Sequence, residues 1–204
     1  MIKTINLTKS FGSELLFSDL NITIPKGQIT VIVGISGKGK TTLLRLLAGL
    51  DKDYQGRIEN VPERVSWVFQ EDRLLPWLNL YDNLALVVAS KQGALDTILA
   101  TLRLVGLEDD KFKMPSELSG GMQRRAALAR ALLFQADYMF LDEPFSALDN
   151  KTKQELSNRL FALAKEKGLA LVIVTHDLEI AEKADNLIDL GERKLTKTYK
   201  KEYF

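Results

Sequence analysis

Cysteine is missing from the 204-residue chain, and histidine occurs only once, at position 176. Without cysteine the chain can form no disulfide framework and no zinc–thiolate site, and it has no thiol nucleophile. Long apolar runs are also missing, because none approaches the ~18 residues that a membrane-spanning helix requires. The first residues, Met1–Asn6, lack the apolar core of a signal peptide. The first expectation is therefore a soluble cytoplasmic protein.

Charge of one sign is not in excess either, since 28 basic and 27 acidic residues give a net charge of +1. A chain without a basic surplus is not expected to bind nucleic acid through general electrostatic attraction. Apolar residues make up 46% of the sequence, which is enough for a sizeable core. The length is large for one small domain and small for two full ones, so we expect one domain spanning residues 1–204.

What the chain does have is a glycine-rich stretch between a buried-strand pattern at 28–33 and a helix-forming run at 43–48. The stretch reads Gly34, Ile35, Ser36, Gly37, Lys38, Gly39, Lys40, Thr41, Thr42. Glycines here allow successive N–H groups to point inward, and the helix N-terminus adds partial positive charge. The pattern predicts a nucleotide phosphate-binding loop, in which Lys40 reaches the β- and γ-phosphates and Thr41 ligates Mg²⁺. It does not indicate which reaction follows.

Acidic side chains end a second buried-strand pattern, at residues 138–141. Two carboxylates are costly to bury without a cation, so Asp142 is expected to share a Mg²⁺ with Thr41. Glu143 is then placed to polarise a water for attack on the γ-phosphate. His176 follows a third buried-strand pattern at 169–174. Since ligands of open α/β sheets bind beyond the carboxyl ends of strands, a functional histidine is favoured over a purely structural one.

Three further segments leave alternatives open. Phe11 suits either stacking on a nucleotide base or packing in the core. The run Leu118, Ser119, Gly120, Gly121 precedes a strong helix pattern and, taken alone, indicates only a capped helix. In the part of the chain between Phe11 and Leu118, the sequence patterns of residues 81–89 and 93–105 predict helices. The apolar loop Leu74–Trp77 is either a docking surface or part of the packing of these helices.

The order of these motifs resembles that of ABC-type ATPases, the nucleotide-binding subunits of transporters. The resemblance rests on residues 34–42, Gln70, Leu118–Gly121, Asp142–Glu143, Ser146–Asp149 and His176, and covers almost the whole chain. It implies a P-loop α/β fold with a mainly parallel core sheet. It also implies an antiparallel β-subdomain, mostly residues 1–32 and 57–69, and a helical subdomain at about 71–134.

The resemblance also implies roles for site residues. Phe11 would stack on the adenine of ATP, and Lys40 with the loop amides would hold the phosphates. Thr41, Gln70 and Asp142 would serve the Mg²⁺ ion.

Catalysis and dimer contact are implied in the same way. Glu143 would be the general base, His176 would hold the γ-phosphate, and Gln70 would belong to the catalytic group. Ser119–Gly121 would close on the ATP of a second copy, with Asp149 supporting that contact. The resemblance thus favours a site over a simple capped helix at Ser119.

Within the superfamily, the sequence from Val68 to Trp77 is similar to that of ATPases from the nitrate/sulfonate/taurine importer group. Two positions depart from the common signature pattern. Met122 replaces the glutamine often found there. Arg124 stands where many relatives have glutamine, which could alter local contacts.

The implied function is ATP hydrolysis in a nucleotide-sandwiched homodimer that drives import through separate membrane-spanning permease subunits. An extracytoplasmic substrate-binding protein would complete the system, and the chain would lie peripherally on the inner face of the membrane. Two rivals are a non-transport ABC ATPase and a P-loop small-molecule kinase. The first usually carries tandem cassettes or coiled-coil insertions, for which this chain has no room. The second would need neither Ser119–Gly121 nor the Asp142–Glu143 pair followed by His176.

Overall fold

The computed structural model describes residues 1–88, 93–191 and 197–200, the last range for its backbone only. The elements, in chain order, are β1 Ile2–Phe11, β2 Glu14–Leu20, β3 Thr23–Ile24, β4 Ile29–Val33, α1 Lys40–Leu47, β5 Gln55–Glu59, β6 Val65–Val68, α2 Leu80–Ala85, α3 Ala94–Leu104, 3-10 helices Glu108–Asp110 and Pro115–Glu117, α4 Gly120–Leu133, β7 Tyr138–Asp142, α5 Asn150–Lys167, β8 Ala170–Val174, α6 Leu178–Glu182, β9 Asn186–Asp189 and β10 Lys197–Lys200.

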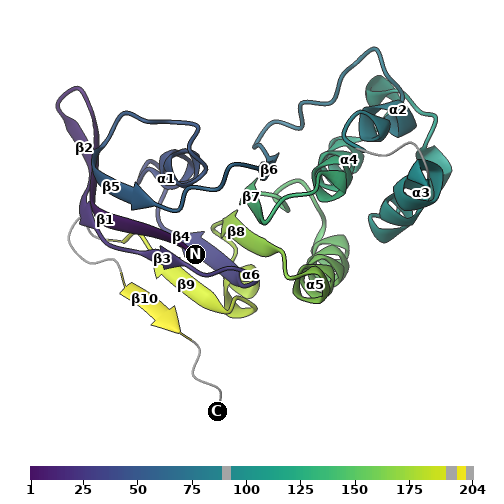
Figure 1. The fold of residues 1–204 in the computed structure, drawn as a ribbon. Coiled ribbons are helices and arrows are strands. Elements are labelled where there is room, and N and C mark those ends of the chain that lie inside the picture. The colour runs from purple at the N-terminus through teal and green to yellow at the C-terminus, as the bar shows by residue number, and fades with distance from the viewer. Residues whose placement is uncertain (89–92, 192–196, 201–204) are drawn as a thin grey trace.

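A mainly parallel sheet forms the centre of the molecule (Figure 1). Within the described residues it has six strands in the order β10-β9-β4-β8-β7-β6, and only β10 runs antiparallel to its neighbour. Strands covered on both faces need nearly continuous apolar sequence, and β7 and β8 are buried along their whole length. The parallel arrangement brings the carboxyl ends of β4, β6, β7 and β8 to one edge of the sheet.

A second, antiparallel sheet contains β2, β1, β3 and β5 in the described part of the chain, with β5 paired to β1. Strands β1 and β2 form a hairpin in which Phe11 lies opposite Glu14. This hairpin therefore carries Phe11 at the tip of β1.

The two faces of the parallel sheet pack into separate apolar clusters. Leu171 and Ile173 of β8 join a cluster that includes side chains of α4 and α5. Val172 and Val174, which point to the opposite face, join a cluster with α1 and the antiparallel sheet. Helix α1 is thus fixed by packing, which positions the loop that precedes it.

Helices α2, α3 and α4 form a helical part at one end of the molecule, at the upper right in Figure 1. Leu84 of α2 and both Ile98 and Leu102 of α3 join the same buried cluster as α4. Among the described residues, no helix has both the length and the apolar character needed to cross a membrane.

Some sequence-based boundaries are wrong. Strands β4 and β6 pair within the parallel sheet, whereas the sequence places residues 29–32 and 65–69 in the antiparallel subdomain. The predicted helix 81–89 is shorter, because α2 ends at Ala85; position 89 lies outside the described residues. The sequence predicts neither β9 nor β10, because each has only four residues, polar residues interrupt the apolar pattern of β9, and β10 is almost wholly polar.

Candidate nucleotide-binding site

Several of the predicted site residues converge beyond the carboxyl ends of the parallel strands. The loop 34–39 follows β4, Gln70 comes two residues after β6, Asp142 ends β7, and His176 follows β8. In an open α/β sheet this edge is where ligands bind. Four segments that are distant in sequence therefore meet at one place.

The loop between β4 and α1 has the backbone geometry of a phosphate cradle. Gly39 has a φ of 80° and caps α1, and an added Cβ would come within 3.1 Å of the Leu16 side chain. Gly34 has a φ of 152°, and its missing Cβ leaves room for Leu190. The Lys40 ammonium donates to the Gly34 carbonyl at 2.7 Å and to the Ile35 carbonyl at 3.1 Å. The Lys40 side chain is thereby folded over the loop, where an anion would sit.

A cavity of about 420 Å³ opens above this loop. Its lining residues are Phe11, Glu14, Leu16, Ser36, Gly37, Gly39, Lys40, Thr41, Thr42, Gln70, Asp142, Glu143 and Val174. The structure thus brings together predicted residues from the loop, from the ends of β1 and β7, and from the segment that follows β6. Gly34, Ile35 and Lys38 lie in the loop but not in this lining, and neither do His176, Ser119–Gly121 or Asp149.

Phe11 belongs to the cavity rather than to the core. Its side chain is 53% exposed and lines the cavity. The Lys9 ammonium lies 4.8 Å from its ring centroid and forms ion pairs with Asp51 and Asp53 at 3.1 Å each. The core alternative for Phe11 is therefore wrong, and the ring is available for stacking.

Asp142 is a buried carboxylate that suits a divalent cation. The residue is 3% exposed, and none of the described residues forms an ion pair with its carboxylate. Burial raises its pKa, and a hydrogen bond with Thr41 opposes that rise. Thr41 and Gln70 line the same cavity, so one carboxylate, one hydroxyl and one amide face it. This donor set fits Mg²⁺ that completes its shell with phosphate oxygens and water.

Glu143 is held at both carboxylate oxygens. His176 Nδ1 lies 2.9 Å from Oε1, and the Thr175 hydroxyl donates to Oε2 at 3.2 Å. Because a carboxylate only accepts, Nδ1 donates and the His176 Nε2 atom remains for another partner. The His176 side chain is 76% exposed. The structure therefore places this histidine beside Glu143, at the rim of the site.

Ser119–Gly121 form the start of α4 at the surface, as the capped-helix pattern indicates. The Ser119 side chain accepts from the Met122 amide at 3.3 Å. An added Cβ on Gly121 would lie 3.2 Å from the Ala147 carbonyl. Asp149 caps α5 by accepting from the Thr152 amide at 3.0 Å. The helix start and the 146–149 loop thus lie against each other, away from the cavity of the same chain.

Two residues with site contacts were missed as site residues. The sequence pattern identifies Thr175 only as the residue that follows a buried strand. Its place next to His176 is the signal that could have indicated a hydroxyl contact with Glu143. Arg124 was noted only as a departure from a pattern. It is buried and donates to the main chain of Asp142 and Glu143. No local signal revealed this contact, because it joins residues 18 and 19 positions apart.

The fold and these contacts define an ATP-binding cassette, and comparison with known proteins agrees. The family model described as "ABC transporter" matches residues 17–146, so the chain belongs to the ABC transporter family. It is similar to the aliphatic sulfonates import ATP-binding protein SsuB 1 of Paracoccus denitrificans, with 44% identity over 176 residues, 86% of this chain and 72% of that protein. The similarity to SsuB 1 of Xanthomonas axonopodis pv. citri is 39% over 198 residues, 90% of this chain and 78% of the relative.

Solved structures give the same answer for the fold. A dimeric bacterial ABC transporter cassette superimposes with a TM-score of 0.88 and 30% identity, covering 100% of both chains. A post-hydrolysis state of the same cassette, bound to ADP and Pi, gives 0.87 and 29%, again covering 100% of both. The predicted family, fold class and ATPase activity are thereby confirmed.

Proposed function

We propose that this chain binds and hydrolyses ATP between two copies of itself and thereby drives import of an aliphatic sulfonate through separate membrane subunits. The observation that carries the proposal is the single cavity lined by Lys40, Thr41, Asp142 and Glu143, in a chain about 40% identical to sulfonate import ATPases. The sequence predicts a broader group of substrates, which includes nitrate- and taurine-like solutes as well as sulfonates.

In the proposed complex the phosphates of ATP lie in the loop 34–42. The amides of the loop and the N-terminus of α1 face the negative charge, and Lys40 moves from the loop carbonyls to the β- and γ-phosphates. The Phe11 ring stacks on the base. Thr41, Gln70 and Asp142 would hold Mg²⁺, which would neutralise phosphate charge when bound.

For hydrolysis, Glu143 accepts a proton from the attacking water. The contacts from Thr175 and His176 hold its carboxylate in a fixed direction. His176 is proposed to hold the γ-phosphate through Nε2. Because Nδ1 already donates to Glu143, this contact requires the imidazolium form, in which both ring nitrogens donate. Gln70 is proposed to sense the same phosphate from the end of β6.

A second copy is proposed to complete the site. One loop leaves one face of the γ-phosphate uncovered, and the exposed start of α4 at Ser119–Gly121 is a complementary anion site on another copy. The position of this segment outside the cavity of its own chain supports contact in trans. Asp149, in the loop beside Gly121, is proposed to support the dimer contact.

The proposed partners in the membrane are permease subunits, and an extracytoplasmic binding protein is proposed to deliver the solute. The chain would then be held at the inner face of the cell membrane through the permease. The names of the curated relatives, which describe import ATP-binding proteins, support this arrangement.

Uptake by cells that lack this chain tests the proposed substrate. We expect uptake of labelled ethanesulfonate to be lost on deletion and restored by the wild-type chain, because transport requires the ATPase. A Glu143→Gln chain, expressed to the same level, should not restore it. Normal ethanesulfonate uptake in the deleted cells would contradict the sulfonate assignment. ATP hydrolysis by the purified chain is measured separately, so that the substrate and the ATPase activity are tested independently.

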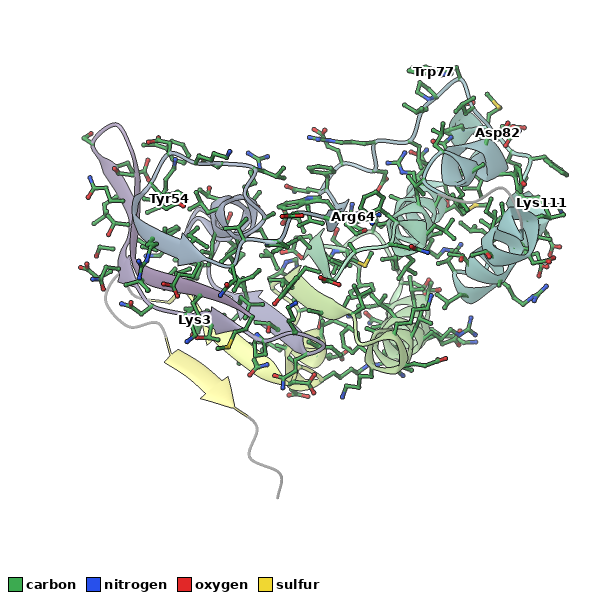
Figure 2. The ribbon with its side chains drawn as sticks, in the orientation of Figure 1. Lys3, Tyr54, Arg64, Trp77, Asp82 and Lys111 are labelled. Atoms are coloured by element: carbon green, nitrogen blue, oxygen red, sulfur yellow. The ribbon has the colours of Figure 1, made fainter. Side chains whose placement is uncertain are left out.

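The exposed Trp77 is the proposed docking residue for the permease. Its side chain is 69% exposed at the outer end of the helical part (Figure 2), so the alternative that it packs among the helices is not supported. Asn83 fixes the preceding loop through the amide and carbonyl of Leu75. Removing the ring should therefore change the surface without unfolding the loop.

We expect Trp77→Ala to leave ATPase activity of the isolated chain within about twofold of wild type, because an exposed side chain contributes little to stability. In the membrane complex, ATP hydrolysis should no longer depend on the transported solute. Phe112→Ala removes an equally exposed aromatic ring from the same part of the chain and serves as the control. Equal loss of coupling in both variants, or unfolding of the isolated Trp77→Ala chain, would contradict a docking role for Trp77.

A further inference from the structure

Arg124 is a buried arginine whose role the nucleotide site does not explain. It lies in the second turn of α4, and its side chain is 3% exposed. One nitrogen donates to the Phe69 carbonyl and to Asp72 Oδ1 at 3.2 Å. The other donates to the Asp142 carbonyl at 3.0 Å and to the Glu143 carbonyl at 2.7 Å. One guanidinium therefore joins α4 to the ends of β6 and β7.

The contact with Glu143 falls on a strained part of the backbone. Glu143 has a φ of 49°, in the left-handed region that residues other than glycine rarely adopt. Pro144 follows it and restricts its conformation further. Such a conformation persists only when neighbouring groups hold it. The Glu143 carbonyl accepts from Arg124 and, at 3.1 Å, from the Ser146 hydroxyl.

The same side chain also holds the segment that carries Gln70. Its contacts with Phe69 and Asp72 lie on either side of that glutamine. Arg130, farther along α4, donates to the Arg73 carbonyl at 2.8 Å. The segment 69–73 is thus tied to the helix at two points.

We propose that Arg124 is a positioning residue that fixes the Glu143 peptide and the Gln70 segment to α4. This inference rests on the proposed function. Because α4 begins at Ser119–Gly121, the guanidinium links the surface that meets the ATP of one site to the base that acts in the other. Movement of α4 against a partner copy is then transmitted directly to Glu143.

A merely stabilising role accounts less well for the geometry. Burying the guanidinium costs desolvation that its pairing with Asp72 has to offset, so the ion pair by itself is weak evidence for a stabilising role, although removing one partner alone destabilises the chain. Four acceptors on two segments instead restrict where those segments can lie. A geometric role predicts an effect on turnover that is larger than the effect on ATP binding.

The adjacent Arg125 offers a matched control. Its guanidinium also donates to two main-chain carbonyls, those of Val105 at 2.8 Å and Gly106 at 3.0 Å. Those carbonyls lie in the helical part and not at the site. Arg125→Gln therefore removes the same kind of contact from the same helix.

The experiment compares Arg124→Gln, Arg124→Lys and Arg125→Gln with wild type. In the nucleotide-free chains, hydrogen exchange should become faster in residues 69–73 and 142–148 for Arg124→Gln, but near residues 105–107 for Arg125→Gln. ATP affinity by calorimetry should stay within about threefold for all variants, since Lys40 and its loop are unchanged. For Arg124→Gln, kcat per bound ATP should fall about 10- to 100-fold, the cost of a misplaced catalytic group.

Arg124→Lys retains one charged donor and should recover part of the lost kcat. If Arg124→Gln fails to fold, Arg124→Lys carries the test, with faster exchange at 142–148 and lower kcat expected. Unchanged exchange at 142–148, or an equal fall of kcat in Arg125→Gln, would overturn the proposal. A wild-type chain that failed to hydrolyse ATP would contradict the proposed function. The hydrogen-exchange comparison would still test the role of Arg124, because it needs no hydrolysis.

Discussion

Replacing Lys40 with alanine is expected to weaken ATP binding on the order of a hundredfold or more. The reason is the loss of a cation that donates directly to phosphate oxygens, a contact whose truncation typically costs about 2–5 kcal/mol. In the structure the ammonium lies over the loop, on the Gly34 and Ile35 carbonyls, ready to exchange these for a charged ligand. Titration calorimetry with ATP measures the change in Kd.

Two further chains separate this effect from damage to the loop. Lys40→Met keeps most of the apolar stem while removing the charge, and should bind ATP as weakly as Lys40→Ala. Lys52→Ala removes one positive charge from an exposed position after α1 and should bind normally. Wild-type affinity in a folded Lys40→Ala chain would contradict the assignment of loop 34–42 as the phosphate site.

Replacing Glu143 with glutamine is expected to lower turnover by at least about a hundredfold, because a general base contributes roughly 10²–10⁴ in rate. Binding should persist, since the amide has the same shape and can keep both contacts. Its oxygen accepts from His176 Nδ1, and its NH₂ group can donate to the Thr175 hydroxyl. ATP should therefore stay bound and unhydrolysed in the variant.

Phosphate release measured beside ATP binding decides this case. Thr175→Val serves as a comparison, because it removes the contact to one Glu143 oxygen while leaving the base in place. We expect it to lower turnover less than Glu143→Gln does. Glu143→Gln turnover within a few-fold of wild type would show that another group takes the proton.

Much of the site could be predicted because its motifs are local in sequence. The loop 34–42 and the pair Asp142–Glu143 each occupy one strand end, and strand ends of parallel sheets meet at the same edge. Phe11 could not be assigned locally, because an apolar ring suits both core and ligand. Only its position on the β1–β2 hairpin, facing the cavity, separated the two alternatives.

The parts that escaped prediction depend on contacts between distant segments. Strand β6 looked like the antiparallel strands, and only its pairing with β7 assigns it to the parallel sheet. Helix α2 ends at Ala85 although apolar residues continue beyond it. Arg124 lies on a helix whose sequence has no unusual feature. Its partners follow the ends of β6 and β7, and nothing in the sequence indicates that these segments contact the helix.

The central claim is that two copies close on ATP, and light scattering on the Glu143→Gln chain tests it most directly. The chain should have the mass of a monomer without nucleotide and of a dimer with ATP in the absence of Mg²⁺. Adding Ser119→Arg should abolish the dimer, because a bulky cation then occupies the α4 N-terminus that would face the γ-phosphate. A Glu143→Gln chain that is saturated with ATP and still monomeric at high concentration would contradict the claim.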